Sequence, residues 1–184
     1  MTLAERILAL HQALSKRRVP FAFGGALALA YWTQDPRGTS DIDINLFVDS
    51  GNPEKGLRAL PDGVTQPEGT IEAIKRDGQI RLWWDETPID LFFDYTDLHA
   101  DAARHRRLVP FAGTEIPVLG PVELAVFKAM FDRTRDLADI EAMLAAQTLD
   151  VDAVREHLAA MLGEYDVRLA RLDEAVRRVD LGQH

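Results

Sequence analysis

Two aspartates in the segment DIDINLFV, Asp41 and Asp43, have a spacing that suits phosphate chemistry. Residues two apart in an extended strand share a face, so both carboxylates would project from the same edge. Two anions held this close repel each other and are costly to desolvate unless a cation lies between them. Mg²⁺ suits the pair, because it takes oxygen ligands and keeps positions for water and substrate phosphates. The spacing therefore predicts a Mg²⁺ site of the kind that supports phosphoryl displacement.

Two other interpretations of this aspartate pair have to be weighed. The pair fits the solvated face of an edge strand, and its spacing alone leaves that interpretation open. Together with Asn45 it also imitates the start of a calcium-binding loop. The calcium interpretation fails, because Leu46 stands where such a loop needs glycine and Asn52 stands where it needs glutamate.

A pair of glycines precedes the aspartates. Gly24 and Gly25 follow the apolar run VPFAF and come directly before the helix-forming run ALALAYW. A strand that ends in glycines and runs into a helix exposes backbone N–H groups at the positive end of that helix, where phosphate binds. A glycine pair alone usually marks only a turn. Its place before the alternating aspartates predicts a phosphate site.

A further aspartate lies in the run TPIDLFFD. Asp90 lies there between Ile89 and Leu91, where an unpaired charge would be expensive. Its neighbours favour Asp90 as a metal ligand or general base. Trp83 and Trp84, just upstream, are expected to be core residues more often than a platform for stacked bases.

The segment GGALALAYW…RGTSDIDI resembles the signature of the DNA polymerase β-like nucleotidyltransferase superfamily, which has Gly-Gly or Gly-Ser before Asp-x-Asp on the next strand. Within it, the sequence is similar to the AbiEii group, including the MenT-type toxins, with G-G-x-x-L-x-x-x-Y before R-x-S-x-D-I-D. The sequence departs from that pattern because Ser40 directly precedes Asp41. The matching positions are Gly24, Gly25, Leu29, Tyr31 or Trp32 (with a shift), Arg37, Ser40, Asp41 and Asp43.

A second block, ELAVFKAMFDRTRDLADIEAML, resembles the K-x-x-A-x-x-x-R and D-x-x-D elements of the same group. Its matching residues are Lys128, Arg133, Asp136 and Asp139, although the alanine is displaced and the arginine comes early. Lys128 near a helix end can reach triphosphate oxygens as a mobile charge. The two aspartates share a helical face from which they could orient that lysine, a base or a metal-bound water. A salt-bridged surface hairpin of helices is the alternative.

The resemblance implies an enzyme that transfers a nucleoside monophosphate from an NTP and releases pyrophosphate. It implies that Asp41 and Asp43 hold Mg²⁺ and that Asp90 completes the ion that activates the acceptor hydroxyl. The two glycines and Ser40 would hold the β- and γ-phosphates. Lys128 and Arg37 would neutralise developing charge. The residues implied in nucleotide binding and catalysis besides the metal ligands are Gly24, Gly25, Arg37, Ser40, Lys128 and Asp139.

The resemblance to MenT-type toxins implies a tRNA 3′ end as acceptor, a block of translation, and a cognate antitoxin as partner. The basic runs SKRR and RHRR could then bind acceptor-stem phosphates. A small-molecule nucleotidyltransferase acting on antibiotics is the runner-up, because an acidic surface suits cationic drugs. A catalytically silent module that binds a nucleotide or a partner is the third interpretation.

The alternation along the strand also yields a regulatory hypothesis. If the strand is already extended at Thr39, that hydroxyl faces the metal and phosphate site beside Asp41 and Asp43. Ser40 would then point away from the site. Phosphorylation of Thr39 would add about −1.5 to −2 charge beside the aspartates and block triphosphate binding.

Composition narrows the class of protein. The chain has 184 residues, a formal net charge of −9 and a sequence pI near 5.0, so it does not coat nucleic acid with a uniformly basic surface. The absence of cysteine excludes disulfides and cysteine-based zinc sites. No run approaches the ~20 apolar residues that cross a bilayer. The N-terminus reads as an amphipathic helix and not a signal peptide, which favours the cytoplasm.

Hydrophobic periodicity gives the expected order of elements. A mixed α/β region, with a small mixed sheet flanked by helices, is expected over residues 1–120, and the resemblance implies a nucleotidyltransferase fold for it. A helical subdomain packed on that core is expected over residues 121–184. The strands expected to carry the site are Val19–Phe23, Asp41–Val48 and the hairpin QIRLWWDETPIDLFFDY.

Overall fold

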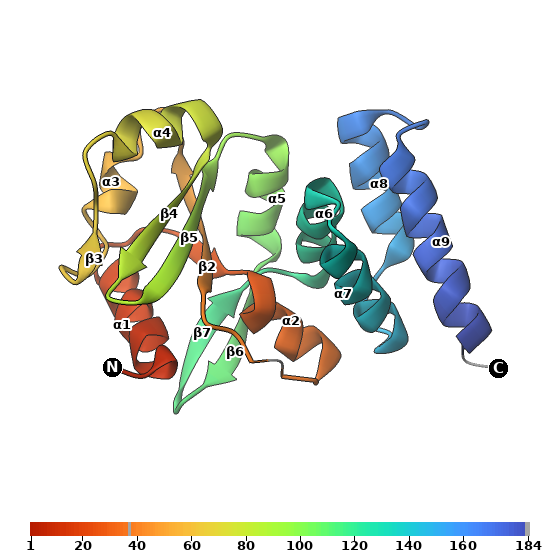
Figure 1. Cartoon of the computed structure of the whole chain (residues 1–184), viewed down its shortest axis with the longest axis horizontal. Coiled ribbons are helices and arrows are strands. Elements are labelled where there is room, and N and C mark those ends of the chain that lie inside the picture. The colour runs from red at the N-terminus through yellow and green to blue at the C-terminus, as the bar shows by residue number, and fades with distance from the viewer. Residues whose placement is uncertain (37, 183–184) are drawn as a thin grey trace. The chain divides into compact units, whose positions relative to one another are not determined.

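The computed structural model describes residues 1–36 and 38–182 of the chain (Figure 1). The chain forms two compact units. The first comprises Met1–Leu27 and Arg37–Leu119, and the second comprises Ala28–Pro36 and Gly120–His184. The division falls within helix α2 (Gly25–Thr33), so the glycine end of that helix belongs with the sheet.

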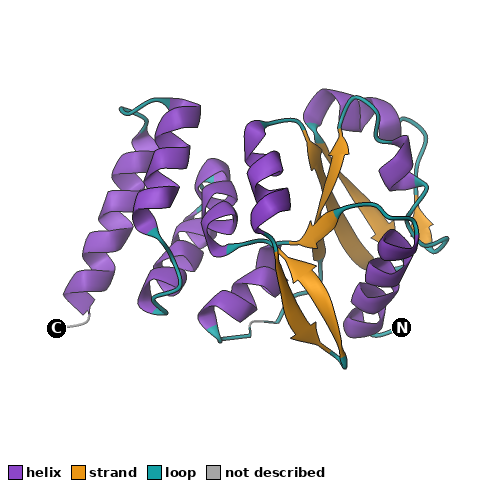
Figure 2. Cartoon of the chain, turned by 180° about the vertical axis from the view of Figure 1, so that it is seen from behind, coloured by secondary structure: helices purple, strands orange, loops and turns teal. Residues whose placement is uncertain are grey.

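The first unit is built on one seven-stranded sheet. Its strands are β1 (Phe21–Phe23), β2 (Ile42–Asp49), β3 (Val64–Thr65), β4 (Gln79–Trp84), β5 (Thr87–Asp94), β6 (Arg107–Phe111) and β7 (Thr114–Val118). Their order in the sheet is β3-β4-β5-β2-β1-β7-β6. The β2–β5 and β1–β7 pairs are parallel, and the others are antiparallel. The mixed sheet flanked by helices that the sequence predicts is confirmed (Figure 2).

The central strands have one apolar face, because buried residues alternate along them. Ile42, Ile44 and Leu46 of β2 stand in register with the buried Ile89, Leu91 and Phe93 of β5. Three helices lie on that side of the sheet in both views (Figures 1 and 2), namely α1 (Leu3–Lys16), α3 (Glu54–Leu57) and α4 (Thr70–Asp77). Burial of this face is the main source of stability for the unit.

The opposite face of β2 and β5 is more polar, and helix α5 (Asp97–His105) covers one end of it. The guanidinium of Arg106, directly after that helix, lies 5.9 Å from the ring centroid of Phe47 on β2. Asp43 and Asp90 lie farther toward the start of the same two strands, on this face. The alternation that buries the isoleucines therefore also presents the aspartates.

The second unit contains the helices that periodicity predicts at Val122–Phe131, Asp136–Ala146, Asp152–Leu162 and Val167–Val179, with bounds that differ by a few residues. They are α6 (Pro121–Phe131), α7 (Thr134–Ala145), α8 (Val151–Leu162) and α9 (Val167–Gly182). Gly120 and Pro121 begin the first of them, as expected where proline takes the first helical position. Among the described residues, no helix is both long enough and apolar enough to cross a bilayer.

Two local details differ from the sequence-based expectation. The two-residue strand Val64–Thr65 is too short to leave a pattern, and only its pairing with β4 defines it. Thr96 precedes the helical run 97–107 and is a residue type that favours an N-cap. It does stand at the N-cap of α5, but its hydroxyl lies 3.0 Å from Nδ1 of His99 and makes no capping bond to a backbone N–H. A buried ring within reach competes for that hydroxyl.

The burial of His99 should make folding sensitive to acid. Its side chain is 1% exposed, and burial lowers its pKa to about 4. The unfolded ring takes up a proton below its ordinary pKa of 6.5, while the folded ring stays neutral until about 4. Stability is therefore full above the unfolded pKa and is lost as the pH falls toward the folded one, by roughly 3 kcal/mol.

Urea unfolding at neutral and acidic pH measures this loss in wild type and His99→Gln. The variant should lose roughly 3 kcal/mol less than wild type on acidification, since only the histidine binds the extra proton when unfolded. His105→Gln, at an exposed position on the same helix, is the control and should behave as wild type. Equal acid sensitivity of all three proteins would contradict the prediction.

Candidate active site

Pairing of two parallel strands brings the predicted carboxylates onto one face. Asp43 of β2 is the direct cross-strand partner of Asp90 of β5. Asp41 directly precedes β2 and lies two residues before Asp43, so the extended chain places it on the same face. The Asp41 side chain is 39% exposed and that of Asp90 18% exposed. The three aspartates that the sequence singles out therefore come from neighbouring strands of the first unit.

A fourth charged residue, Arg81 of β4, belongs to this cluster and was not predicted from the sequence. Its Nε and Nη2 donate to the two carboxylate oxygens of Asp90 at 2.7 and 2.6 Å. Its Nη2 also lies 3.9 Å from Oδ2 of Asp41. The hydrogen bonds to Asp90 and the charge of that carboxylate raise the pKa of the Arg81 guanidinium.

The hairpin sequence held a signal that could have identified Arg81. A two-residue turn at Asp85 and Glu86 pairs the residues on either side of it and fixes the register of the whole hairpin. Counting back from that turn sets Arg81 opposite Asp90. The same count sets Trp83 opposite Pro88 on this face, where it is 46% exposed, whereas Trp84 points to the other face and is 8% exposed. The expectation of a core residue therefore fits Trp84 and is wrong for Trp83.

The acidic cluster has the composition of a divalent-cation site, although the described residues contain no preformed group of three metal-binding side chains. Its donors are carboxylate oxygens, which Mg²⁺ prefers. The guanidinium of Arg81 shows that this face accepts a positive group between Asp90 and Asp41. The residues therefore fit a divalent cation, with both oxygens of Asp90 engaged by arginine.

The glycine pair is required by its contact with Asp43. Gly25 has a φ of +50°, and a Cβ there would lie 1.8 Å from Oδ2 of Asp43. A Cβ on Gly24 would lie 2.9 Å from Nδ2 of Asn45. The N–H of Gly24 donates to the carbonyl of Asp43 at 2.9 Å. Because that donor is used within the sheet, a phosphate role for the pair falls to the start of helix α2 at Gly25.

Two residues with hydroxyl groups, Thr39 and Ser40, lie in the sequence between helix α2 and the aspartates. Thr39 donates to Oδ1 of Asp41 at 2.5 Å, so its hydroxyl faces the acidic cluster. Strand alternation does not place it there, because the chain bends at Ser40 and β2 begins only at Ile42. Ser40 is exposed. Both line a hollow of about 620 Å³ together with Arg6 and Asp85. Phosphorylation at Thr39 stays a prediction, and Arg37, predicted to bind nucleotide, lies outside the described residues.

Lys128 lies in the second unit, within a buried ionic network. Its Nζ donates to Oδ2 of Asp139 at 2.7 Å and lies 3.7 Å from Oδ1 of Asp136. Arg133 binds Asp136 from the other side, with Nε to Oδ2 at 2.6 Å. The lysine and both aspartates are buried. The alternative of a surface hairpin is therefore wrong, although the salt-bridging that it implied is present.

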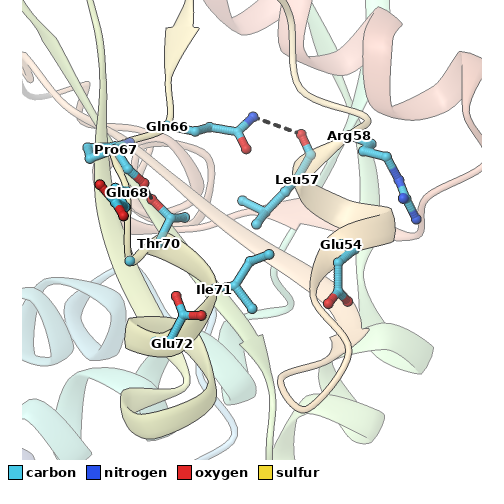
Figure 3. Close-up of a pocket in the computed structure, with 10 residues that line it drawn as sticks. Glu54, Leu57, Arg58, Gln66, Pro67, Glu68, Thr70, Ile71 and Glu72 are labelled. Carbon is cyan, nitrogen blue, oxygen red and sulfur yellow. Dashed lines mark hydrogen bonds between the residues drawn. The ribbon is translucent and has the colours of Figure 1, made fainter.

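A second hollow lies apart from the candidate site. It has a volume of about 410 Å³ and is bounded by α3, α4 and the segment before α4 (Figure 3). Gln66 donates to the carbonyl of Leu57 across it at 3.1 Å. Among the described residues, none of those predicted for the site lines this hollow. This hollow is therefore separate from the candidate active site.

Replacing Gly25 by alanine should be more damaging than the same change at another left-handed glycine. Gly113 has a φ of +85°, and a Cβ added there would meet nothing within 4 Å, so Gly113→Ala carries only the backbone strain, about 1 kcal/mol. Gly25→Ala adds the overlap with Asp43, for a total loss of about 3 kcal/mol. Urea unfolding of both variants measures the difference, and equal losses would show that the overlap is relieved without cost.

Removing the charge of Lys128 should destabilise the second unit. Lys128→Met leaves Asp139 without its lysine partner and should lower the free energy of unfolding by roughly 3 kcal/mol. Arg178→Gln is the control, because its bonds to Glu141 and Glu174 are exposed, so it should lose much less stability than the lysine variant. A lysine variant no less stable than the control would contradict a structural role for the network. Thermal or urea unfolding provides the comparison.

Comparison with known proteins supports a nucleotidyltransferase fold. The antibiotic-resistance factor ANT(2'')-Ia matches with a TM-score of 0.62 and 15% identity, over 88% of this chain and 92% of that one. An antigenic nucleotidyltransferase-like protein from Paracoccidioides brasiliensis gives 0.43 at 15% identity, over 90% of both chains. JHP933 from Helicobacter pylori gives 0.46 at 15% identity, over 98% of this chain and 93% of that one. Only the TM-score of 0.62, for ANT(2'')-Ia, supports a shared fold.

No curated protein matches the sequence. The family model for the nucleotidyl transferase AbiEii toxin of type IV toxin–antitoxin systems matches residues 6–183. Because that match covers nearly the whole chain, the chain belongs to the AbiEii nucleotidyltransferase toxin family.

Proposed function

We propose that this chain transfers a nucleoside monophosphate from an NTP to the 3′ end of tRNA in a Mg²⁺-dependent reaction, and that the transfer blocks translation. The observation that carries the proposal is the register of Asp43 with Asp90, with Asp41 on the same face and Gly25 against Asp43. Like charges in such register are otherwise unfavourable. The family supports an NTP substrate and an antitoxin partner.

In this proposal the acidic cluster places the reacting groups. Asp41, Asp43 and Asp90 would hold Mg²⁺, which when bound would polarise the phosphate and acceptor oxygens. Asp90 would accept the proton of the acceptor hydroxyl. The acceptor oxygen forms a bond to the α-phosphorus, and the bond from that phosphorus to the bridging oxygen breaks, so pyrophosphate leaves. Gly25 would present the start of α2 to the β- and γ-phosphates.

Lys128 is proposed to neutralise charge on the triphosphate, with Asp139 as its positioning partner. The hydrogen bond of 2.7 Å between them supports the positioning half of this role. Arg37 and Ser40 are proposed as further nucleotide-binding residues on the strength of the family pattern. Because Lys128 also stabilises its unit, the activity of any variant there has to be compared at equal folded fraction.

Exposed basic residues on the first unit support a nucleic-acid acceptor in a protein of net charge −9. Residues 15–18, SKRR, and residues 104–107, RHRR, are exposed throughout. Such local clusters bind phosphates in a salt-dependent manner. The hollow beside Ser40, which contains the acidic Asp85, is instead the feature that would suit a small cationic acceptor.

Mass analysis of tRNA 3′ ends after incubation with each NTP tests the proposed reaction. Wild type should add nucleotides with one or more NTPs, and Asp43→Asn should reduce the rate by at least about a hundredfold, since positioning and charge stabilisation supply most of the catalysis. Asp77→Asn, an exposed acid paired with Arg76, is the control and should retain the rate.

Parallel reactions with aminoglycosides and lincosamides separate the acceptors. Transfer to a drug but not to tRNA would replace the tRNA acceptor with a small molecule. Absence of transfer to every acceptor would favour a silent binding module. A rate for Asp43→Asn within a few-fold of wild type would remove the assigned role of this carboxylate.

A further inference from the structure

Arg81 occupies the middle of the acidic cluster. It is the antiparallel cross-strand partner of Asp90, and its guanidinium makes two parallel hydrogen bonds to that carboxylate, at 2.7 and 2.6 Å. The same Nη2 lies 3.9 Å from Oδ2 of Asp41. One arginine therefore contacts two of the three carboxylates assigned to the cation.

The charges explain why an arginine is favourable at this position. Asp41, Asp43 and Asp90 together carry three negative charges on adjacent strands, and neighbouring like charges disfavour the folded arrangement. The guanidinium offsets part of this repulsion, and its planar fork matches the carboxylate of Asp90. The Asp90 side chain is only 18% exposed, so this pair is screened less than one on an open surface.

The same contacts restrict access to Asp90. Each of its oxygens accepts a hydrogen bond from Arg81, so a divalent ion that takes both oxygens has to displace the guanidinium. An ion on a remaining lone pair of either oxygen meets the positive charge of the arginine. The Arg81 side chain is 51% exposed and lies on a strand surface, so it can turn into solvent without repacking the core. An incoming triphosphate offers the released guanidinium a new anionic partner.

We propose that Arg81 is an internal counter-cation that holds the acidic cluster together before the divalent ion binds and is exchanged from Asp90 when the ion and triphosphate enter. The proposal rests on the metal site of the proposed function. It makes Arg81 a positioning residue that weakens binding of the ion alone and couples ion binding to nucleotide binding. That coupling is reciprocal, because each ligand favours the released state of the arginine.

Binding of Mn²⁺, followed by electron paramagnetic resonance and calorimetry without nucleotide, tests the proposal directly. Arg81→Gln should bind Mn²⁺ about tenfold more tightly than wild type, because no guanidinium competes for Asp90. Arg81→Lys should fall between the two, since a single ammonium cannot form the paired bonds. Arg76→Gln removes an equivalent pair of hydrogen bonds to an exposed carboxylate, that of Asp77, and should leave the affinity for Mn²⁺ unchanged.

Two further measurements distinguish exchange from a structural role. Without metal, Arg81→Gln should melt at a lower temperature than wild type, and Mn²⁺ should raise its melting temperature more. A non-hydrolysable NTP analogue should tighten Mn²⁺ binding in wild type by a larger factor than in Arg81→Gln. If Arg81 had only a structural role, its replacement would lower the melting temperature. It would change neither the stabilisation by Mn²⁺ nor the tightening of Mn²⁺ binding by the NTP analogue.

The outcomes separate this proposal from the one on which it rests. Loss of Mn²⁺ binding in Asp43→Asn would place the ion at the acidic cluster. Equal or weaker Mn²⁺ binding by Arg81→Gln, with wild type binding normally, would overturn the exchange while leaving the metal site intact. Absence of Mn²⁺ binding by every variant would overturn the metal site and the exchange together.

Discussion

Parallel pairing of β2 with β5 is the constraint on which the candidate site depends. It sets Asp43 directly beside Asp90, an arrangement that electrostatics disfavours unless a cation compensates it. The pairing itself is held by the other face of the same strands, where Ile42, Ile44 and their partners on β5 are buried. A shift of register by one residue would expose those isoleucines. Hydrophobic burial thus keeps the carboxylates together against their mutual repulsion.

The close approach of β1 to β2 imposes a second constraint. Gly25 adopts a positive φ in which its backbone lies against the Asp43 side chain, and Gly24 passes close to Asn45. A residue with a Cβ at Gly25 would occupy the position of the carboxylate itself. The glycines are therefore needed for the shape of the candidate site. The proposed phosphate contact at Gly25 is compatible with this requirement, because a backbone without a side chain permits close approach by both a side chain and a ligand.

The ionic residues of the second unit differ in character from those on the sheet. Lys128 and Asp139 are buried and bonded to each other, and Asp136 is bonded to the exposed side chain of Arg133. Loss of one member of such a buried network leaves an uncompensated charge. On the sheet, by contrast, the Arg81 side chain is half exposed. The buried network therefore resists rearrangement, whereas the exposed guanidinium suits the exchange that we propose for it.

The sequence by itself determined most of the elements and suggested most of the residues of the candidate site. Alternation in DIDINLFV and TPIDLFFD indicated the strands and the three aspartates, and helical periodicity indicated the C-terminal helices within a few residues, because these signals are local. Pairing between distant strands is not local. Only the tertiary structure decided that β2 and β5 are parallel neighbours with Asp43 opposite Asp90, that Arg81 holds Asp90, and that Lys128 is buried against Asp139. Those contacts depend on the burial of whole faces, which no single segment encodes.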